Sequence, residues 1–453
     1  MNASPAADQP VARIAASARL RGELRLPGDK SISHRALLLA ALAAGESVIE
    51  GAGDGADVRS TAGIVAALGA EVERRPGDGP TVTYRIVSPG ADGLREPAAA
   101  LDCGNSGTSL RLSAGMLAGL PMTTTLDGDD SLRGRPVARI IEPLRSMGAE
   151  LHARQNDSLP PVTVVGRTPL RAIEFATPVP SAQVKSAILL AGLRADGRTT
   201  VRESVATRDH TERMLRSRGV PVERTGSADG EMTVTVEGGL TVHAVTERVP
   251  GDVSAAAFWL VAGAIHPDAE LVLHDVGVNP TRRAVIDILR SMGADIEERP
   301  RAGDPDADDG VGEPVADLVA RSSELHAVDI GPTDVAAAID EIPVLCLAAT
   351  AATGTTVIRG AGELRHKESD RIEAIATNLR ALGARIETFE DGFAIDGPTP
   401  LCGARVSSFG DHRIAMAMAV AGLVADGRTE LDDDAVVAIS YPRFFRDLGG
   451  LAR

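Results

Sequence analysis

The chain has 453 residues and 43% of them are hydrophobic, so it can form two large domains, each with its own apolar core. A net charge of −16 and only one Trp, two Tyr and seven Phe argue against a nucleic-acid-binding surface, which would be basic and would carry stacking side chains. Three scattered cysteines predict neither a disulfide framework nor a zinc site, and they fit a reducing cytoplasm. No apolar run is long enough to cross a membrane, and we expect residues 1–12 to form a loose tail.

The first predicted element, residues 26–42 (LPGDKSISHRALLLAAL), is a Pro-Gly turn followed by a helix of mostly Ala and Leu. A helix this apolar is expected in a core, with its polar start at the surface of a site. That start contains Lys30, two serines that could cap the helix, and the pair Ser31 and Arg35, four residues apart on one face. Because unpaired N–H groups and the helix dipole favour anions there, this start is a candidate anion site. An ordinary capped helix with solvated charges is the alternative.

The same pattern recurs six times along the chain, as an Ala/Leu helix with a polar start, a short strand, an amphipathic helix and a "GA"-type turn. The starts of the apolar helices are 71 to 81 residues apart, near Lys30, Asn105, Ser181, Asp252, Thr333 and Asp411. The sixth copy of the amphipathic helix, FFRDLGG, is truncated. We therefore expect one supersecondary unit of two helices and short strands, copied six times. Residues 77–90 and 299–327 are predicted as loops or hairpin insertions, the second of them acidic.

The strand candidate ARLRGELRLPG (18–28) precedes the first copy and has no partner nearby, so we expect it to pair with the last copy. That pairing would place both chain ends in one domain. The chain would then cross between domains near 26–29 and again near 248–252, where RVPGD repeats the Pro-Gly turn.

Other helix starts supply further candidate ligands. Gly107 in GNSGTSLRL would let a ligand approach the backbone, with Arg111 one turn on, and Arg135 lies in a loop before the next helix. The third copy, PSAQVKSA, places Ser181, Gln183 and Lys185 close together, a set of donors suited to phosphate and hydroxyl oxygens. Plain helix starts and solvated loop arginines are the alternatives.

Carboxylates and cations gather in the last two copies. Asp340 and Glu341 fall inside a predicted apolar helix, where an unpaired carboxylate is costly, so each needs a partner or a chemical role. In ELRHKESDRIE (363–373), Lys367 and Arg371 are four residues apart, and we expect them to share a helical face with an anion between them, beside Glu368. Arg413 begins the sixth apolar helix.

Lysine is rare in this chain, since it occupies only positions 30, 185 and 367 among 47 basic residues. Because lysine is a compact charge that can change protonation state, its retention predicts that each position lies in a site, against the alternative of chance survival. Cys103 has no histidine near it in the sequence and is interpreted as a small buried residue. No metal-binding or nucleophile motif is present, and we expect no metal and no cofactor.

These motifs, LPGDKSISHRALLLAAL, GNSGT, SLRGRPV, PSAQVKSA, RHKESDR and GDHRIAMA, occur in this order over nearly the whole chain and closely resemble the 5-enolpyruvylshikimate-3-phosphate (EPSP) synthase family. The resemblance implies an α/β (α+β) protein with the enolpyruvyl transferase fold, a two-domain inside-out barrel of six βαβαββ units. One domain is expected at 28–249, and the other at 1–27 plus 250–453, with hinges near 26–29 and 248–252. The helix N-termini are expected to face a cleft that closes on the substrates.

The resemblance also implies 3-phosphoshikimate 1-carboxyvinyltransferase activity, in which the enolpyruvyl group of phosphoenolpyruvate moves to the 5-hydroxyl of shikimate 3-phosphate and phosphate leaves. Asp340, Glu368 and Lys30 are the implied catalytic residues. Those implied for shikimate 3-phosphate are Lys30, Ser31, Arg35, Ser181, Ala182, Gln183, Thr207, Asp340 and Lys367. Those implied for phosphoenolpyruvate are Lys30, Gly107, Arg135, Gln183, Arg371 and Arg413. We expect a cytoplasmic monomer whose partners are these small molecules, not nucleic acid or membrane.

Some positions depart from the family pattern. Ala182 stands where some members have serine, and Ile439 stands where many have a lysine that contacts phosphoenolpyruvate. Gly107 and Leu112 give opposite indications about sensitivity to glyphosate. Two rival functions remain: the sister enzyme that transfers enolpyruvate to UDP-N-acetylglucosamine, and a catalytically dead sugar-phosphate-binding protein. The sister enzyme usually has Lys-Asn where Lys30 and Ser31 stand.

Overall fold

The computed structural model describes residues 12–226, 230–300 and 311–452, and residues 1–11 of the predicted tail lie outside these ranges. The chain forms two compact units. Among the described residues, unit 1 consists of 12–26, 251–300 and 315–452, and unit 2 of 27–226, 230–250 and 311–314. Each unit contains three copies of the predicted repeat, which confirms the mixed α/β fold of βαβαββ units.

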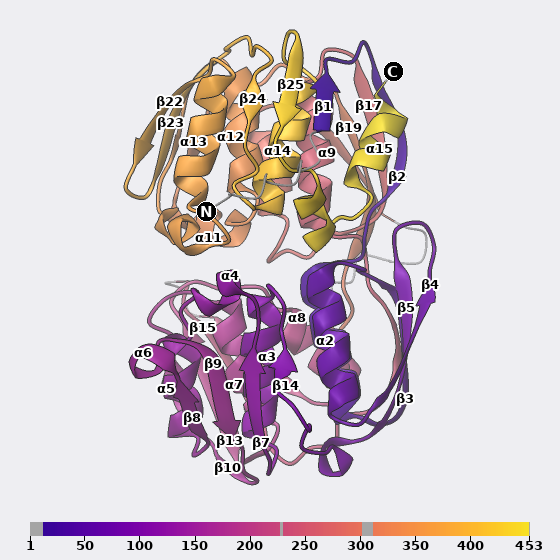
Figure 1. Ribbon diagram of the computed structural model, residues 1–453, viewed down its shortest axis with the longest axis vertical. Coiled ribbons are helices and arrows are strands. Elements are labelled where there is room, and N and C mark those ends of the chain that lie inside the picture. The colour runs from indigo at the N-terminus through magenta and orange to yellow at the C-terminus, as the bar shows by residue number, and fades with distance from the viewer. Residues whose placement is uncertain (1–11, 227–229, 301–310, 453) are drawn as a thin grey trace, which may run out of the picture. The chain divides into compact units, whose positions relative to one another are not determined.

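The first copy in unit 2 begins with the apolar helix. Its elements are α1 (Lys30–Leu42), β3 (Ala44–Ala52), α2 (Ala56–Ala67), β4 (Glu71–Pro76) and β5 (Val82–Pro89). Strand β16 (Thr246–Arg248), from the far end of the unit, pairs in parallel with β3 and completes the sheet β16-β3-β5-β4. Residues 77–90, predicted as a loop or hairpin insertion, are mostly β5, the second strand of a hairpin with β4. Figure 1 shows β3, β4 and β5 at the edge of unit 2 beside α2.

The second and third copies complete unit 2. The second contains β6 (Leu101–Asp102), α3 (Gly107–Ala118), β7 (Thr123–Asp127), α4 (Asp130–Arg133), α5 (Ala138–Ser146), β8 (Glu150–Ala153), α6 (Arg154–Asp157) and β9 (Leu159–Val165). The third contains β10 (Leu170–Arg171), β11 (Glu174–Ala176), α7 (Ala182–Gly192), β12 (Ala195–Asp196), β13 (Arg198–Glu203), α8 (His210–Ser217), β14 (Val222–Gly226) and β15 (Met232–Glu237). Their four-stranded sheets have the equivalent orders β6-β7-β9-β8 and β11-β13-β15-β14.

Unit 1 is built from the last three copies and the N-terminal strands. Its elements are β1 (Ala12–Ala15), β2 (Leu20–Arg25), α9 (Val253–Ile265), β17 (Ala269–Gly277), α10 (Ala284–Ser291), β18 (Asp295–Pro300), β19 (Val315–Arg321), β20 (Asp329–Ile330), α11 (Pro332–Ala338), α12 (Ile342–Ala351), β21 (Gly354–Ile358), α13 (Arg371–Ala381), β22 (Arg385–Phe389), β23 (Gly392–Gly397), β24 (Arg405–Val406), α14 (His412–Gly422), β25 (Arg428–Leu431) and α15 (Phe444–Leu451). In the view of Figure 1, α9, α12 and α14 lie between the strands β22 and β23 on one side and β17 and β19 on the other.

The N-terminal strand pairs differently from the prediction. Strand β2, which falls within residues 18–28, forms its parallel ladder with β17 of the fourth copy, whereas it meets the last copy through an isolated antiparallel bridge between Leu20 and Ala452. The fourth copy starts directly with its apolar helix, so β2 supplies its missing first strand. The shorter β1 pairs antiparallel with β25 of the last copy, as β5 pairs with β3 in the first copy. Both N-terminal strands thus complete sheets of unit 1.

One contact recurs at the end of the amphipathic helices. In four copies, an arginine in the last turn donates to the backbone carbonyl six residues further on, at the start of the next strand: Arg145 to Leu151, Arg216 to Val222, Arg290 to Ile296 and Arg380 to Ile386. The glycine in the turn between, at 148, 219, 293 or 383, has a φ of 79° to 101°, which favours glycine. This explains the "GA"-type turn seen in the sequence.

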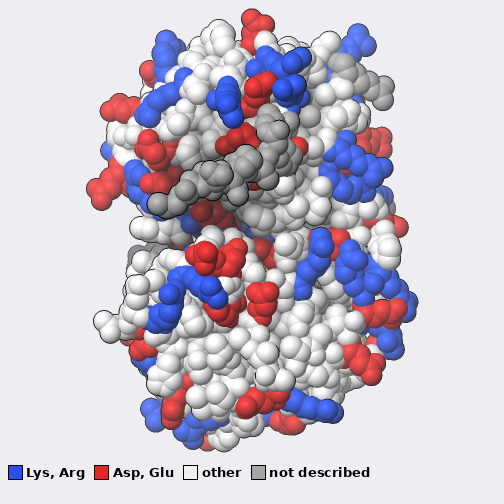
Figure 2. All heavy atoms as spheres, viewed as in Figure 1, with Lys and Arg blue, Asp and Glu red and all other residues white. Residues whose placement is uncertain are grey.

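In the described ranges every sheet is open, with two edge strands, so the fold consists of separate small sheets around buried helices and not of a closed β-barrel. The buried helices α1, α3 and α7 form the core of unit 2, and α9, α12 and α14 form that of unit 1. Basic and acidic side chains intermix over the face drawn in Figure 2. Among the described residues, no helix is both long and apolar enough to cross a membrane.

Candidate active site

The start of α1 is capped by Asp29 and not by either serine. The Asp29 carboxylate accepts from the Ile32 N–H at 2.9 Å, while Ser31 and Ser33 lie inside the helix. Lys30 is therefore the first helical residue, and its Nζ lies 3.0 Å from the buried Asp57 Oδ2. The Lys30 side chain keeps an exposure of 20%, so a ligand can reach it.

Arg35 is buried and held by three protein groups. It donates to Thr211 Oγ1 and Ser186 Oγ, each at 2.7 Å, and to the Ser31 carbonyl at 2.8 Å. Burial, with the charge of Arg208, lowers the pKa of Arg35 to about 10. Arg208 also donates to Ser31 Oγ at 3.5 Å. Sequence reasoning missed Arg208, although it directly follows the predicted contact Thr207.

The start of α3 brings together residues predicted from three different motifs. Ser106 caps the helix, and Gly107 is its first residue. Arg111 donates from Nη1 to Gln183 Oε1 at 2.8 Å, and Arg135 donates from Nη2 to Asn105 Oδ1 at 2.5 Å. A Cβ added at Gly107 would lie 2.6 Å from Arg111 Nη1 and 3.8 Å from Arg135 Nη1. This residue therefore has to lack a side chain for the Arg111 guanidinium group to remain where it is, whereas the distance to Arg135 is an ordinary contact.

The start of α7 contains Ser181, which caps the helix, and Ala182, its first residue. The prediction that Lys185 faces a ligand is wrong. Its side chain is fully buried, and Nζ lies 2.8 Å from both Glu203 Oε2 and Glu212 Oε1. Burial opposes the charge, but the two glutamates outweigh it and raise the pKa of Lys185.

Thr207 is tied to this buried ion pair. Its hydroxyl donates to Glu203, and its carbonyl accepts from Lys185 at 3.3 Å. Lys185 therefore stabilises the loop that carries Thr207 and Arg208, and its role is structural.

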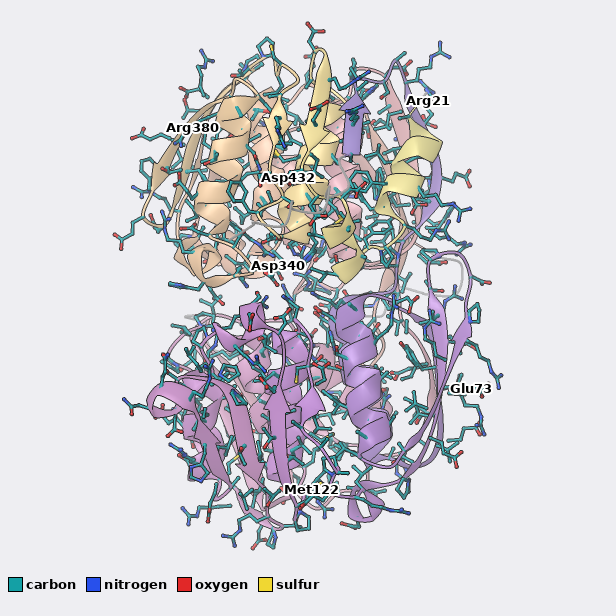
Figure 3. All side chains as sticks on the ribbon, viewed as in Figure 1. Arg21, Glu73, Met122, Asp340, Arg380 and Asp432 are labelled. Atoms are coloured by element: carbon teal, nitrogen blue, oxygen red, sulfur yellow. The ribbon has the colours of Figure 1, made fainter. Side chains whose placement is uncertain are left out.

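In unit 1, Asp340 and Glu341 do not lie inside one helix as predicted. Helix α11 ends at Ala338 and α12 begins at Ile342, with Pro343 in its first turn. Proline is tolerated at a helix start but breaks a helix interior, so the chain is interrupted here. Asp340, labelled in Figure 3, lies at the end of unit 1 where Figure 1 labels α11.

Three cations surround the Asp340 carboxylate. Oδ1 lies 3.4 Å from Arg371 Nη1 and 3.6 Å from Lys367 Nζ, and Oδ2 lies 3.9 Å from Arg413 Nη2. Lys367 precedes α13 and Arg371 begins it, so the expectation that they share a helical face is wrong. They are brought together by the carboxylate between them.

Arg371 is buried and bound to two further carboxylates. It donates from Nε to Asp411 Oδ2 and from Nη2 to Glu368 Oε2, each at 2.7 Å. Burial opposes its charge, but these carboxylates outweigh it and raise the pKa of Arg371. Asp411 in turn caps α14 by accepting from the Arg413 N–H at 2.9 Å. Although Asp411 is buried, Arg371 holds the pKa of Asp411 below its usual value.

Neither a cysteine nucleophile nor a metal site is supported in the two clusters described above, the cationic helix starts of unit 2 and the cations around Asp340 in unit 1. Burial raises the pKa of Cys103, which makes a thiolate nucleophile unfavourable there. The described part of the chain contains no group of three or more His, Cys, Asp or Glu residues arranged to hold a metal ion. What remains in each unit is a set of cations and helix starts suited to anionic ligands, with carboxylates beside them in unit 1.

The fold is similar to that of solved enolpyruvyl transferases. The enolpyruvyl transferase NikO from Streptomyces tendae superposes with a TM-score of 0.77 over 98% of each chain, at 21% sequence identity. The EPSP synthase from Acinetobacter baumannii superposes with a TM-score of 0.84 over 98% of each chain, at 39% identity. The repeats and helix starts described above therefore form the enolpyruvyl transferase fold.

Sequence comparison gives the family. The family model for EPSP synthase (3-phosphoshikimate 1-carboxyvinyltransferase) matches residues 14–448. The 3-phosphoshikimate 1-carboxyvinyltransferase of Gloeobacter violaceus is 53% identical over 436 residues, which are 96% of this chain and 97% of the relative. That of Bacillus thuringiensis subsp. konkukian is 47% identical over 434 residues, with the same coverage. The chain belongs to the EPSP synthase family.

Proposed function

We propose that this protein transfers the enolpyruvyl group of phosphoenolpyruvate to the 5-hydroxyl of shikimate 3-phosphate and releases phosphate, a step in the biosynthesis of aromatic amino acids. The observation that carries the proposal is the 53% identity, over 96% of the chain, to a relative with this activity in its name. The geometry agrees with it, because both substrates are polyanions and both clusters are built from cations and helix starts.

In this proposal, residues of unit 2 bind both substrates. Shikimate 3-phosphate contacts Lys30, Ser31, Arg35, Ser181, Ala182, Gln183 and Thr207. Phosphoenolpyruvate contacts Lys30, Gly107, Arg135 and Gln183. The Arg35 donors already engaged by the protein would keep its charge close to Ser31, so its contribution to phosphate binding is largely electrostatic.

Residues of unit 1 supply the proton transfers. Asp340 and Lys367 contact shikimate 3-phosphate, and Arg371 and Arg413 contact phosphoenolpyruvate. Asp340 accepts the proton of the 5-hydroxyl as its oxygen adds to C2 of phosphoenolpyruvate, while Glu368 delivers a proton to the methylene carbon. Loss of phosphate and of one proton from the resulting tetrahedral adduct restores the double bond.

We further propose that the crossings near 26–29 and 248–252 act as hinges between two domains, and that the protein works as a cytoplasmic monomer without a cofactor. Two of the unit boundaries, between residues 26 and 27 and between residues 250 and 251, support the hinge positions, and another boundary falls between Pro314 and Val315. Size-exclusion chromatography with light scattering tests the monomer.

Phosphate release tests the function. We expect release with phosphoenolpyruvate plus shikimate 3-phosphate, and none when UDP-N-acetylglucosamine replaces shikimate 3-phosphate. Release with the UDP-sugar alone would assign the sister activity instead. Binding of shikimate 3-phosphate without any phosphate release would indicate a binding protein. Glyphosate added at varied phosphoenolpyruvate concentration resolves the opposite indications of Gly107 and Leu112.

A further inference from the structure

Three polar side chains are buried next to the break between α11 and α12 that carries Asp340. They are Ser254 in the first turn of α9, Arg282 shortly before α10, and Glu341, which precedes α12. Their exposed fractions are 5%, 3% and 1%. Ser254 and Arg282 belong to the fourth copy of the repeat, and Glu341 to the fifth. None of the three is in the proposed substrate-binding set.

The three side chains form one hydrogen-bonded network. Arg282 donates from Nη2 to Ser254 Oγ at 2.6 Å and to Glu341 Oε1 at 3.1 Å. The Ser254 hydroxyl also donates to Glu341 Oε1. Arg282 donates from its other terminal nitrogen, Nη1, to the Ala337 carbonyl at 3.4 Å. One guanidinium group therefore binds a backbone group in α11 and the side chain that precedes α12.

These contacts lie on both sides of the helix interruption that carries Asp340. Ala337 is three residues before Asp340, and Glu341 is the residue after it. Between the end of one helix and the start of the next, the backbone lacks the regular helical hydrogen bonds, so other contacts have to fix its path. A planar guanidinium group with donors in a rigid fork suits this task, because it fixes the distance between the groups it binds.

The network also reaches Arg413. Arg413 Nη1 donates to the Asp340 carbonyl at 3.3 Å and lies 3.9 Å from Glu341 Oε1. A shift of Glu341 would therefore disturb both the Asp340 carboxylate and one of the three cations around it.

We propose that Arg282, together with Ser254 and Glu341, positions Asp340 for proton transfer by holding both sides of the helix interruption. The proposal rests on the proposed function, in which Asp340 accepts the proton of the substrate hydroxyl. Arg282 is a positioning residue and does not touch substrate. Stability alone gives little reason for this network, because buried ion pairs can often be replaced by apolar residues without loss of stability.

Arg282→Lys tests the proposal, because lysine keeps the charge but cannot donate in two directions from a planar fork. We expect kcat for phosphate release to fall roughly 10- to 100-fold, since a misplacement of about 1 Å can cost a factor of that order. The Kd for shikimate 3-phosphate, measured by calorimetry, should stay within about threefold, because most of its proposed ligands lie in other elements. Ser254→Ala should lower kcat in the same direction.

Arg218→Lys is the matched control. Arg218 is also a buried arginine that contacts a helix carbonyl, that of Met214, and a glutamate, Glu247, but it lies in unit 2 and outside both clusters. Arg218→Lys should lower the melting temperature about as much as Arg282→Lys does, and it should leave kcat within about twofold of the wild-type value. If kcat falls in both variants in proportion to their decreases in melting temperature, the proposal is overturned. A wild-type kcat in Arg282→Lys overturns it as well.

If Arg282→Lys does not fold, the double variant Arg282→Met, Glu341→Met removes both buried charges and should fold. Its kcat should remain low, and a wild-type kcat would overturn the proposal. The two proposals fail in different ways. If the wild-type protein releases no phosphate from the two substrates, both the proposed function and the proposed role of Arg282 are wrong. If the wild type is active and Arg282→Lys is equally active, only the proposed role of Arg282 is wrong.

Discussion

The substitution Gly107→Ala should weaken phosphoenolpyruvate binding by moving Arg111. The added Cβ would lie 2.6 Å from Arg111 Nη1, whereas an ordinary contact needs about 3.5 Å. The guanidinium group therefore has to withdraw by roughly 0.9 Å. It donates to Gln183 Oε1 at 2.8 Å, and a displacement of that size breaks the hydrogen bond.

A hydrogen bond from a charged donor contributes about 1.5–3 kcal/mol, and each 1.4 kcal/mol is a factor of ten in affinity. If Gln183 needs this bond to stay oriented toward phosphoenolpyruvate, the KM for that substrate should rise about 10- to 100-fold. The KM for shikimate 3-phosphate should change by less than about threefold, because most of its proposed ligands lie elsewhere. Initial rates of phosphate release, with one substrate varied at saturation of the other, measure both constants.

Gly63→Ala is the control for this substitution. Gly63 lies inside α2, and an added Cβ there would meet nothing within 4 Å. It should leave both KM values unchanged and raise the free energy of unfolding by about 0.5–1 kcal/mol, the usual gain from alanine inside a helix. An unchanged KM for phosphoenolpyruvate in Gly107→Ala would refute the reasoning, because it would mean that Arg111 can withdraw without affecting the site.

Three further outcomes are expected. Lys30→Met should lower kcat at least about 100-fold. It should also lower the melting temperature, because it leaves the buried Asp57 without the Lys30 cation. The double variant Lys30→Met, Asp57→Asn should regain the melting temperature in thermal unfolding but not kcat. Lys185→Met should lower the free energy of unfolding in urea by about 3–5 kcal/mol, since it leaves two buried glutamates unneutralised, and a loss below about 1 kcal/mol would contradict its structural role. Burial, with the charges of Lys30 and Arg35, holds the pKa of His34 well below its usual value, so the unfolded chain binds a proton that the folded chain does not. The free energy of unfolding should therefore fall as the pH drops below about 6.5, and His34→Gln should reduce this slope.

The repeat and its helices could be predicted from the sequence because they depend on local patterns. Apolar helices with polar starts, amphipathic helices and positive-φ glycines each recur at a fixed place in the repeat. The strand that completes a copy from elsewhere in the chain could not be assigned in this way. Strand β2 joins β17 although 250 residues separate Arg25 from Asp275, whose side chains pair at that edge.

Burial was the other limit on prediction. Spacing alone made Lys185 look like a ligand donor, because a helix start with several donors has the same pattern whether its side chains point out or in. The network of Ser254, Arg282 and Glu341 had no local signal, since its members come from two copies of the repeat and 59 residues separate Arg282 from Glu341. Pro343, two residues after Glu341, was a signal for the helix interruption that the prediction overlooked.

The contacts of the three lysines share one geometry, whether or not the lysine lies in the proposed site. Lys185 Nζ lies between two glutamates and a carbonyl, Glu203, Glu212 and Thr207, which converge on one point. An ammonium group can donate to three such acceptors, whereas a planar guanidinium group requires acceptors spread along its fork. Arg282, by contrast, binds acceptors that are spread apart, on both sides of Asp340. Lys30 and Lys367 likewise place one compact charge beside a carboxylate, so a retained lysine in this chain indicates a point-charge contact, which a substrate site or a buried core can equally require.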